Sequence, residues 1–184
     1  MFHSAAAEKI LLYFVLPIWL VAGFSDYLCH RASRIELTSG YKESLLHLLM
    51  LVEIGVPLLM AMLLEINALV IAIMLACFVL HQLTALWDTT FASHKRFISP
   101  IEQHVHSFLE LMPLTAMLMV IALNWPQFLS LWGVGSEAAR YDLVLKQEPL
   151  PWQFVVGFLA ASVLFEALPF LEEFVRGLRA RKRS

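Results

Sequence analysis

The sequence has little charge for its length. Only 15% of its 184 residues are Asp, Glu, Lys or Arg, against about 25% in a typical soluble domain. Apolar residues make up 60% of the chain and its mean hydropathy is +0.73, whereas soluble domains contain about 45–50% apolar residues. The net charge of −2 is near neutral and gives no sign of a nucleic-acid partner. We therefore expect one membrane domain over residues 1–184, with no separate soluble module and no nucleic-acid partner.

Cysteine is nearly absent as well. Cys29 and Cys77 lie in or beside apolar stretches and form no CxxC pair, so neither a disulfide framework nor a zinc ribbon is implied. The first apolar stretch, residues 10–24, has no basic leader and no small-residue cleavage site. We expect this stretch to stay in the protein as a membrane span, because a secretory signal would need both features.

Long apolar runs predict five transmembrane helices, since one crossing needs about 20 mostly apolar residues. After the first span at 10–24, the run 44–87 is too long for one crossing and breaks at Glu65-Ile66-Asn67 into two. The fourth span covers about 101–123, and a fifth helix followed by a basic tail covers 153–184. Residues 124–152 contain Pro, Gly and charged groups and are expected to form an extracytoplasmic loop, with 128–132 along the membrane interface.

Lysine and arginine predict the orientation. If the chain crosses the membrane five times, the loops and terminus on one side of the membrane hold ten basic residues, and those on the other side hold only Lys9, Arg140 and Lys146. The ten are Arg31, Arg34, Lys42, Lys95, Arg96, Arg176, Arg179, Arg181, Lys182 and Arg183. Because basic loops stay in the cytoplasm, we expect the N-terminus outside and the C-terminus inside. The expected location is the inner (plasma) membrane of a bacterium.

An internal repeat carries most of the polar groups in the spans. The order Asp, His, basic, Glu, His, Glu, Pro occurs in residues 10–63 and again in 66–123. Both copies run in the same sense, so a twofold axis along the membrane normal would relate them. We expect the first four spans to form a parallel-repeat four-helix bundle of two helical hairpins. The repeated residues are Asp26, His30, Glu43, His47, Glu53 and Pro57, then Asp88, His94, Glu102, His106, Glu110 and Pro113.

These groups are expected to meet at the cytoplasmic end of the spans. Asp26 and His30 are four residues apart, as are Glu43 and His47, so each pair shares a helical face. Ionisable groups at membrane depth cost several kcal/mol unless they are paired or coordinated, and they usually mark function. The predicted metal ligands are Asp26, His30, Glu43, His47, His81, Asp88, His94, Glu102 and His106. Glu53, His104, Glu110 and Glu166 are predicted as further ligands or as partners that orient a ligand.

Each of these residues also has a simpler interpretation. Asp26 could pair with Arg31, and His104 lies off the Glu102–His106 face. His81, about 10 Å deeper than Asp88 at 1.5 Å per residue, could simply bond Thr84 or a backbone carbonyl. The repeated order of the whole set favours a metal site.

Imidazole and carboxylate ligands without thiolate suit iron, manganese or zinc. Asp26, Asp88, Glu43 and Glu102 carry about −4, which two divalent ions balance. The ligand set is similar in chemistry to that of soluble four-helix di-iron proteins, with Glu-x-x-x-His in place of Glu-x-x-His. Its placement is similar to that in membrane fatty acid hydroxylases and desaturases, whose His-x-x-x-His and His-x-x-His-His motifs are absent here. We expect two metal ions, iron first, with zinc or manganese as alternatives.

The expected function is that of a non-haem di-iron oxidoreductase. It would use O2 and an unidentified electron donor to hydroxylate, desaturate or oxidise a membrane lipid or other lipophilic substrate at the cytoplasmic side. One alternative is a zinc-dependent membrane hydrolase of a lipid amide or phosphoester. Another is a metal or proton carrier, but a carrier needs polar residues across the whole membrane, and the outer halves of the spans offer only Glu65 and Asn67 at a turn. A b-type haem bundle would leave the clustered acids unexplained.

Overall fold

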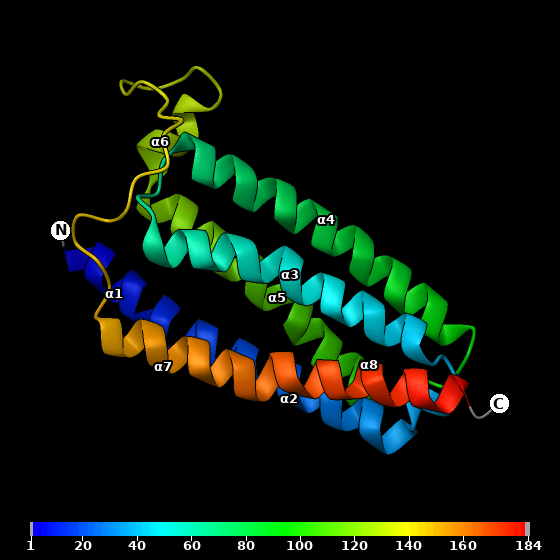
Figure 1. Ribbon diagram of the computed structural model, residues 1–184. Coiled ribbons are helices and arrows are strands. Elements are labelled where there is room, and N and C mark those ends of the chain that lie inside the picture. The colour runs from blue at the N-terminus through cyan, green and yellow to red at the C-terminus, as the bar shows by residue number, and fades with distance from the viewer. Residues whose placement is uncertain (1, 183–184) are drawn as a thin grey trace.

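In the computed structural model, which describes residues 2–182, five long helices run side by side in alternating directions as one bundle (Figure 1). Each is long and apolar enough to cross a membrane, which confirms the predicted all-helical membrane class. The spans are Ala5–Ser33, Tyr41–Leu63, Ala68–Ser93, Pro100–Leu123 and Trp152–Arg181. Arg183, counted above among the basic residues, lies outside the described residues.

The first and fifth spans each consist of three helical segments, and each extends beyond the apolar run that predicted it. The first joins α1 (Phe2–Ile10), a π-helical turn η1 (Leu11–Val15) and α2 (Leu16–Ser33). The fifth joins α7 (Trp152–Ser162), a second π-helical turn η3 (Val163–Ala167) and α8 (Leu168–Arg181). Helix α8 continues beyond the apolar run because Phe170, Glu173 and Gly177 form a buried face at helical spacing.

The three middle spans begin and end where local sequence signals place them. Helix α3 (Tyr41–Leu63) ends before the predicted break, and Asn67 caps α4 (Ala68–Ser93) by accepting a hydrogen bond from the Val70 amide at 3.1 Å. Ser99 caps α5 (Pro100–Leu123) in the same way, with Pro at the first helical position. These caps fix the ends of α4 and α5 relative to their loops.

The loop after α5 covers the N-terminal end of the bundle. It contains a short helix α6 (Trp125–Ser130), which overlaps the segment predicted at the interface. Further along, Leu145 pairs with Leu64 in an isolated bridge, and the Asn67 side chain donates to the Asp142 carbonyl oxygen at 2.7 Å. An apolar cluster of α4 and α5 lies beneath this loop. It comprises Val70, Ile71, Met74, Met117, Val120 and Ile121.

Helix pairing differs from the predicted two hairpins. Helix α2 packs mainly against α5, and α3 packs against α4, so the close pairs join the two halves of the predicted repeat. Helix α8 packs against α3 and also contacts α2. A twofold axis along the membrane normal would generate the same two close pairs, and the repeat itself stays a prediction.

Gly177 explains the close approach of α8 to α3. A Cβ at this position would lie 2.7 Å from the backbone nitrogen of Tyr41, so only glycine allows this contact. Because Glu173 precedes Gly177 by four residues, it lies on the same face of α8 and is held against the start of α3.

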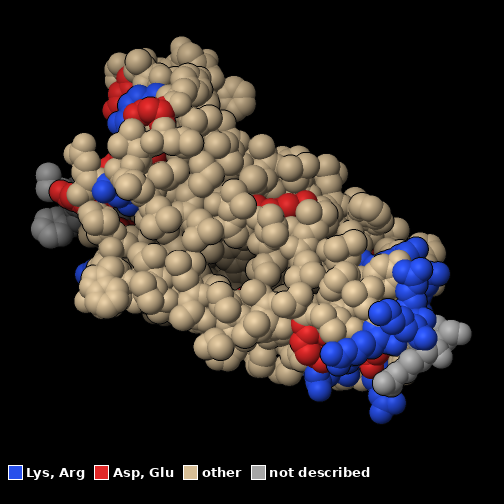
Figure 2. Space-filling view, in the orientation of Figure 1, with Lys and Arg blue, Asp and Glu red and all other residues tan. Residues whose placement is uncertain are grey.

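Basic residues gather at the end of the bundle that carries the C-terminus, whereas the middle of the molecule is almost free of charge (Figure 2). This distribution fits the predicted orientation, which can be tested by labelling. In a background with Cys29 and Cys77 replaced by Ala, a cysteine at Ser136 should react with an impermeant thiol reagent added to intact cells. A cysteine at Lys182 should react only after the cells are opened. The opposite pattern would reverse the orientation and place the polar cluster outside.

Candidate metal centre

Most of the predicted ligands meet where α2 ends and α3 and α5 begin. Two groups of potential ligand atoms each lie within 4.8 Å of one another. One group contains Asp26, His30, Glu102 and His106, and the other contains His30, Glu43 and His47. His30 belongs to both, so the groups form one cluster.

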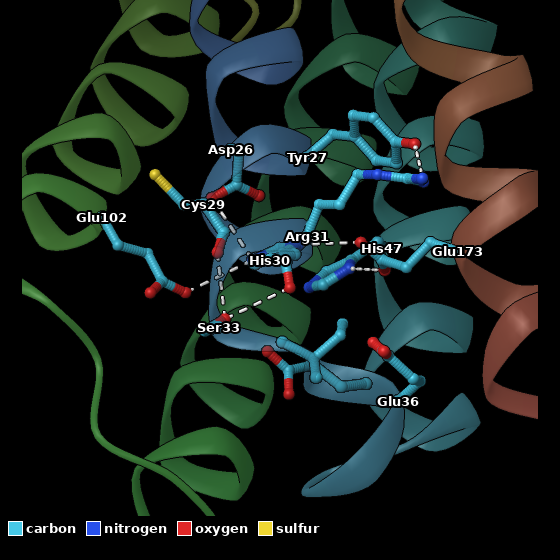
Figure 3. Close-up of polar contacts among 12 residues, drawn as sticks. Asp26, Tyr27, Cys29, His30, Arg31, Ser33, Glu36, His47, Glu102 and Glu173 are labelled. Atoms are coloured by element: carbon cyan, nitrogen blue, oxygen red, sulfur yellow. Dashed lines mark hydrogen bonds and ion pairs between the residues drawn. The ribbon is translucent and has the colours of Figure 1, made fainter. Parts of the chain in front are cut away.

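Two histidines of the cluster are oriented by a carboxylate that the sequence analysis did not include. Glu173 accepts hydrogen bonds from Nδ1 of His30 at 3.0 Å and from Nδ1 of His47 at 2.8 Å (Figure 3). The two rings stack, with centroids 4.4 Å apart and planes 11° apart. When the rings are neutral and each Nδ1–H donates to Glu173, each Nε2 keeps a lone pair that a metal could take. A carboxylate behind a histidine in this way is a common feature of metal-binding histidines.

Four buried atoms of the cluster make no hydrogen bond, although each has an ionisable neighbour within 3.4 Å. They are Nε2 of His30, Nε2 of His47, Oδ1 of Asp26 and Oδ1 of Asp88. His30 Nε2 lies 3.4 Å from Asp26 Oδ1 and 3.4 Å from Glu102 Oε1, and His47 Nε2 lies 3.4 Å from Asp88 Oδ1. An unsatisfied buried polar atom costs about 1–3 kcal/mol. A cation among Asp26, His30, Glu102 and His106, whose ligand atoms lie within 4.8 Å of one another, would satisfy part of this set. Asp88 belongs to neither ligand group and lies beside His47.

The cluster has two similar halves. Nε2 of His106 on α5 lies 2.9 Å from Asp26 Oδ1 on α2, and His47 on α3 lies next to Asp88 on α4. These are corresponding residues of the two predicted repeat copies. Each close helix pair therefore supplies one His and one Asp to the site.

Arg96, from the loop between α4 and α5, pairs with the two glutamates of the cluster. It donates to Glu102 Oε2 at 3.0 Å and to Glu43 Oε1 at 3.2 Å. Burial alone would lower the pKa of Arg96, but the hydrogen bonds and charges of Glu102 and Glu43 raise it above its ordinary value, so Arg96 is charged.

With Arg96 and Glu173 included, the site holds one guanidinium and five carboxylates, those of Asp26, Glu43, Asp88, Glu102 and Glu173. Its formal charge, with neutral histidines, is about −4, which equals the excess predicted from four carboxylates. Two divalent cations would neutralise this charge.

Arg96→Ala should lower stability strongly. Removing one partner of a buried ion pair leaves uncompensated charge and costs about 3–5 kcal/mol. Glu43 and Glu102, which are almost fully buried, would be left facing each other. We expect a large fall in the thermal midpoint of the purified protein, whereas Lys95→Ala, at the exposed neighbouring residue, should leave it nearly unchanged. Equal midpoints for the two variants would show that Arg96 does not hold the two glutamates together.

The prediction of His94 as a ligand is not supported, because its side chain is exposed and its Nδ1 donates to the Thr90 carbonyl oxygen at 2.6 Å. His30 follows Asp26 by four residues, but His94 follows Asp88 by six. At about 100° per residue, six positions turn His94 away from the Asp88 face.

His81 and Glu53 lie deeper in the bundle as a separate pair. His81 Nδ1 is 3.9 Å from Glu53 Oε2, and the other oxygen of Glu53 accepts a hydrogen bond from Thr84 at 2.8 Å. Thr84 therefore bonds Glu53 and not His81. His104 is exposed and its ring packs edge-on against Phe108, so it is also outside the cluster.

Glu110 and Glu166 line a cavity beside the cluster. In the described part of the chain, Glu166 makes no hydrogen bond to a histidine. The histidine-orienting role predicted for Glu166 belongs to Glu173, seven residues later in the same span. The spacing of Glu166, Phe170, Glu173 and Gly177 along one face was a signal for Glu173.

The cavity has a volume of about 490 Å³ and ends at the cluster. Asp26, His47, Asp88 and His106 line its polar end. Its walls are apolar and come from α2, α3 and the fifth span, with residues such as Leu20, Leu51, Ile54 and Phe158. A hollow is visible between α3 and α7 on the uncharged face of the molecule (Figure 2).

The described residues thus include a buried His, Asp and Glu cluster that could hold a metal, next to an apolar cavity. Comparison with protein-family models, with curated proteins and with solved structures gives no match for this chain.

Proposed function

We propose that this protein is a membrane oxidoreductase with a two-metal centre, iron in the first place, that uses O2 to oxidise a lipophilic substrate. The observation that carries the proposal is the set of four buried atoms of Asp26, His30, His47 and Asp88 that make no hydrogen bond, with Glu173 behind both histidines. Such atoms are expensive to bury unless an ion binds them.

Three features favour two ions over one. The site has two similar His–Asp sets, and its charge of about −4 matches two divalent cations. The two groups of ligand atoms share His30, so two neighbouring ions could both be held by this cluster. A single catalytic zinc needs only three protein ligands, fewer than are gathered here.

Ligand type favours iron. Neither free cysteine belongs to the ligand groups found among residues 2–182, which consist of carboxylates and imidazoles. This mixture suits iron, manganese or zinc, and we propose iron first because the proposed reaction needs a redox-active metal. When bound, iron would supply electron transfer to O2.

The cavity favours a lipophilic substrate. Its apolar walls would exclude water and hold a hydrocarbon next to Asp26 and Asp88. In the proposed hydroxylation, one oxygen atom enters a C–H bond and the other leaves as water, with two electrons from a separate donor and two protons. Polar residues are concentrated at one end of the spans, which favours a reaction site over a carrier's path.

The redox prediction separates this proposal from a zinc hydrolase. The purified protein should have a ferric absorption that dithionite bleaches and air restores, since zinc is redox-silent. Glu102→Ala and Glu102→Gln should both abolish the absorption, because each removes a buried anionic ligand. The matched control is Gln103→Ala, at the exposed neighbouring residue on the same helix, which should keep it. A colourless protein with bound zinc and oxygen-independent turnover would contradict the oxidoreductase and favour the hydrolase.

A further inference from the structure

A second cavity of about 290 Å³ lies in the half of the bundle nearer α6. It shares four lining residues with the first cavity: Leu16, Trp19, Ile54 and Leu58. The two cavities therefore lie next to each other inside the bundle, and we call the pair the lumen.

One face of α4 lines the whole lumen. Met74 and Phe78 line the second cavity, and His81, Ala85 and Asp88 line the first, at spacings of three or four residues. From Met74 to Asp88 the helix rises about 21 Å at 1.5 Å per residue. The hydrocarbon core of a bilayer is about 30 Å thick, so the lumen extends over most of one membrane crossing.

The shape of the lumen fits one extended hydrocarbon chain. It lies between helices of one bundle, and packed helices are only about 8–10 Å apart between axes. It opens sideways between α3 and α7, on the uncharged face that would contact lipid (Figure 2). A chain could therefore enter from the bilayer without crossing water.

Glu166 provides a polar anchor near the cluster end of this lumen. It belongs to the π-helical turn η3, and such turns often occur at functional sites. Its carboxylate lies directly against Gly23, where any Cβ would collide with it. Within residues 2–182 it has no hydrogen bond or ion pair, although it lines the cavity. A carboxyl group at membrane depth without a hydrogen-bond partner is costly and points to a missing partner.

We infer that the lumen binds a single-chain lipid whose polar head donates a hydrogen bond to Glu166 and whose chain extends toward Met74. The head-group end would then lie beside Asp26, three residues after Gly23 on α2. Only the identification of this lipid as the substrate rests on the proposed function. The binding itself can be measured without turnover.

Trp19 lines both cavities and can report on the chain. In a variant that keeps only Trp19, with the four exposed tryptophans changed to Phe, a mid-chain dibrominated octadecanol should quench the fluorescence saturably in nanodiscs. A matched variant that keeps only Trp87, on the lipid-exposed surface of α4, should show quenching that rises without saturation. Brominated phosphatidylcholine, which has two chains, should quench Trp87 well and Trp19 poorly.

Two substitutions test the anchor in the Trp19 variant. Glu166→Leu removes the acceptor and should weaken alcohol binding roughly tenfold. Gly23→Ala displaces the carboxylate and should weaken it similarly, whereas Gly157→Ala, where a Cβ meets open space, should not. Unsaturable quenching of Trp19, or equal quenching by the phospholipid, would overturn the lumen as a single-chain site. Unchanged affinity in both anchor variants would overturn the role of Glu166.

Metal content measured in the same samples separates the two proposals. Saturable alcohol binding by a protein that holds no metal would contradict the proposed function alone. Bound, redox-active iron without alcohol binding would contradict this inference alone.

Discussion

His47→Ala should remove most of the bound metal. This substitution deletes the Nε2 atom that faces Asp88 and also leaves Glu173 with one hydrogen-bond partner instead of two. The remaining carboxylates would repel one another in a site of low dielectric constant. Because metal binding and folding are coupled, the variant should also unfold at a lower temperature.

The measurement is metal content per chain by mass spectrometry, with the thermal midpoint from the same preparation. His106→Ala, at the corresponding position of the other repeat copy, should behave like His47→Ala if the two halves form one site. His104→Ala is the matched control, because this exposed histidine lies two residues away on the same helix. Full metal content and an unchanged midpoint in both cluster variants would mean that the repeated residues serve packing only.

Glu173→Ala should weaken metal binding by roughly 10- to 100-fold, the usual effect of removing a carboxylate that orients a metal-bound histidine. In the proposed centre, Glu173 does not bind the metal itself. Its effect would come from His30 and His47, whose rings it holds in one tautomer and one stacked arrangement.

The neighbouring residue provides the control for this prediction. Glu172 is exposed and pairs with Arg31 and Arg176 at the surface, so Glu172→Ala should leave metal affinity unchanged. Affinity can be followed by competition with a chelator of known strength. If Glu172→Ala and Glu173→Ala lose metal equally, the loss reflects the stability of α8 and not the orientation of the histidines.

The spans and much of the cluster could be predicted from the sequence because they depend on local signals. Apolar length, the break at Glu65-Ile66-Asn67 and the cap at Ser99 determine where helices begin and end. The four-residue spacing of Asp26 and His30 puts both on one face, and the structure brings them together.

What the sequence could not reveal depends on packing between distant segments. The fifth span lies against α3 through Gly177, and this contact brings Glu173 to His30 and His47 across more than 120 positions of sequence. Arg96 was interpreted only as a topology signal, but its loop folds back between Glu43 and Glu102. His94 lies outside the cluster because six residues after Asp88 is a different helical face.

The most direct test of the central claim is the metal content of the protein purified from iron-replete cells without chelator. The proposed centre predicts about two ions per chain, mostly iron, as expected for two cations balancing a charge of about −4. A protein that is folded by circular dichroism yet binds no iron, manganese or zinc would contradict it.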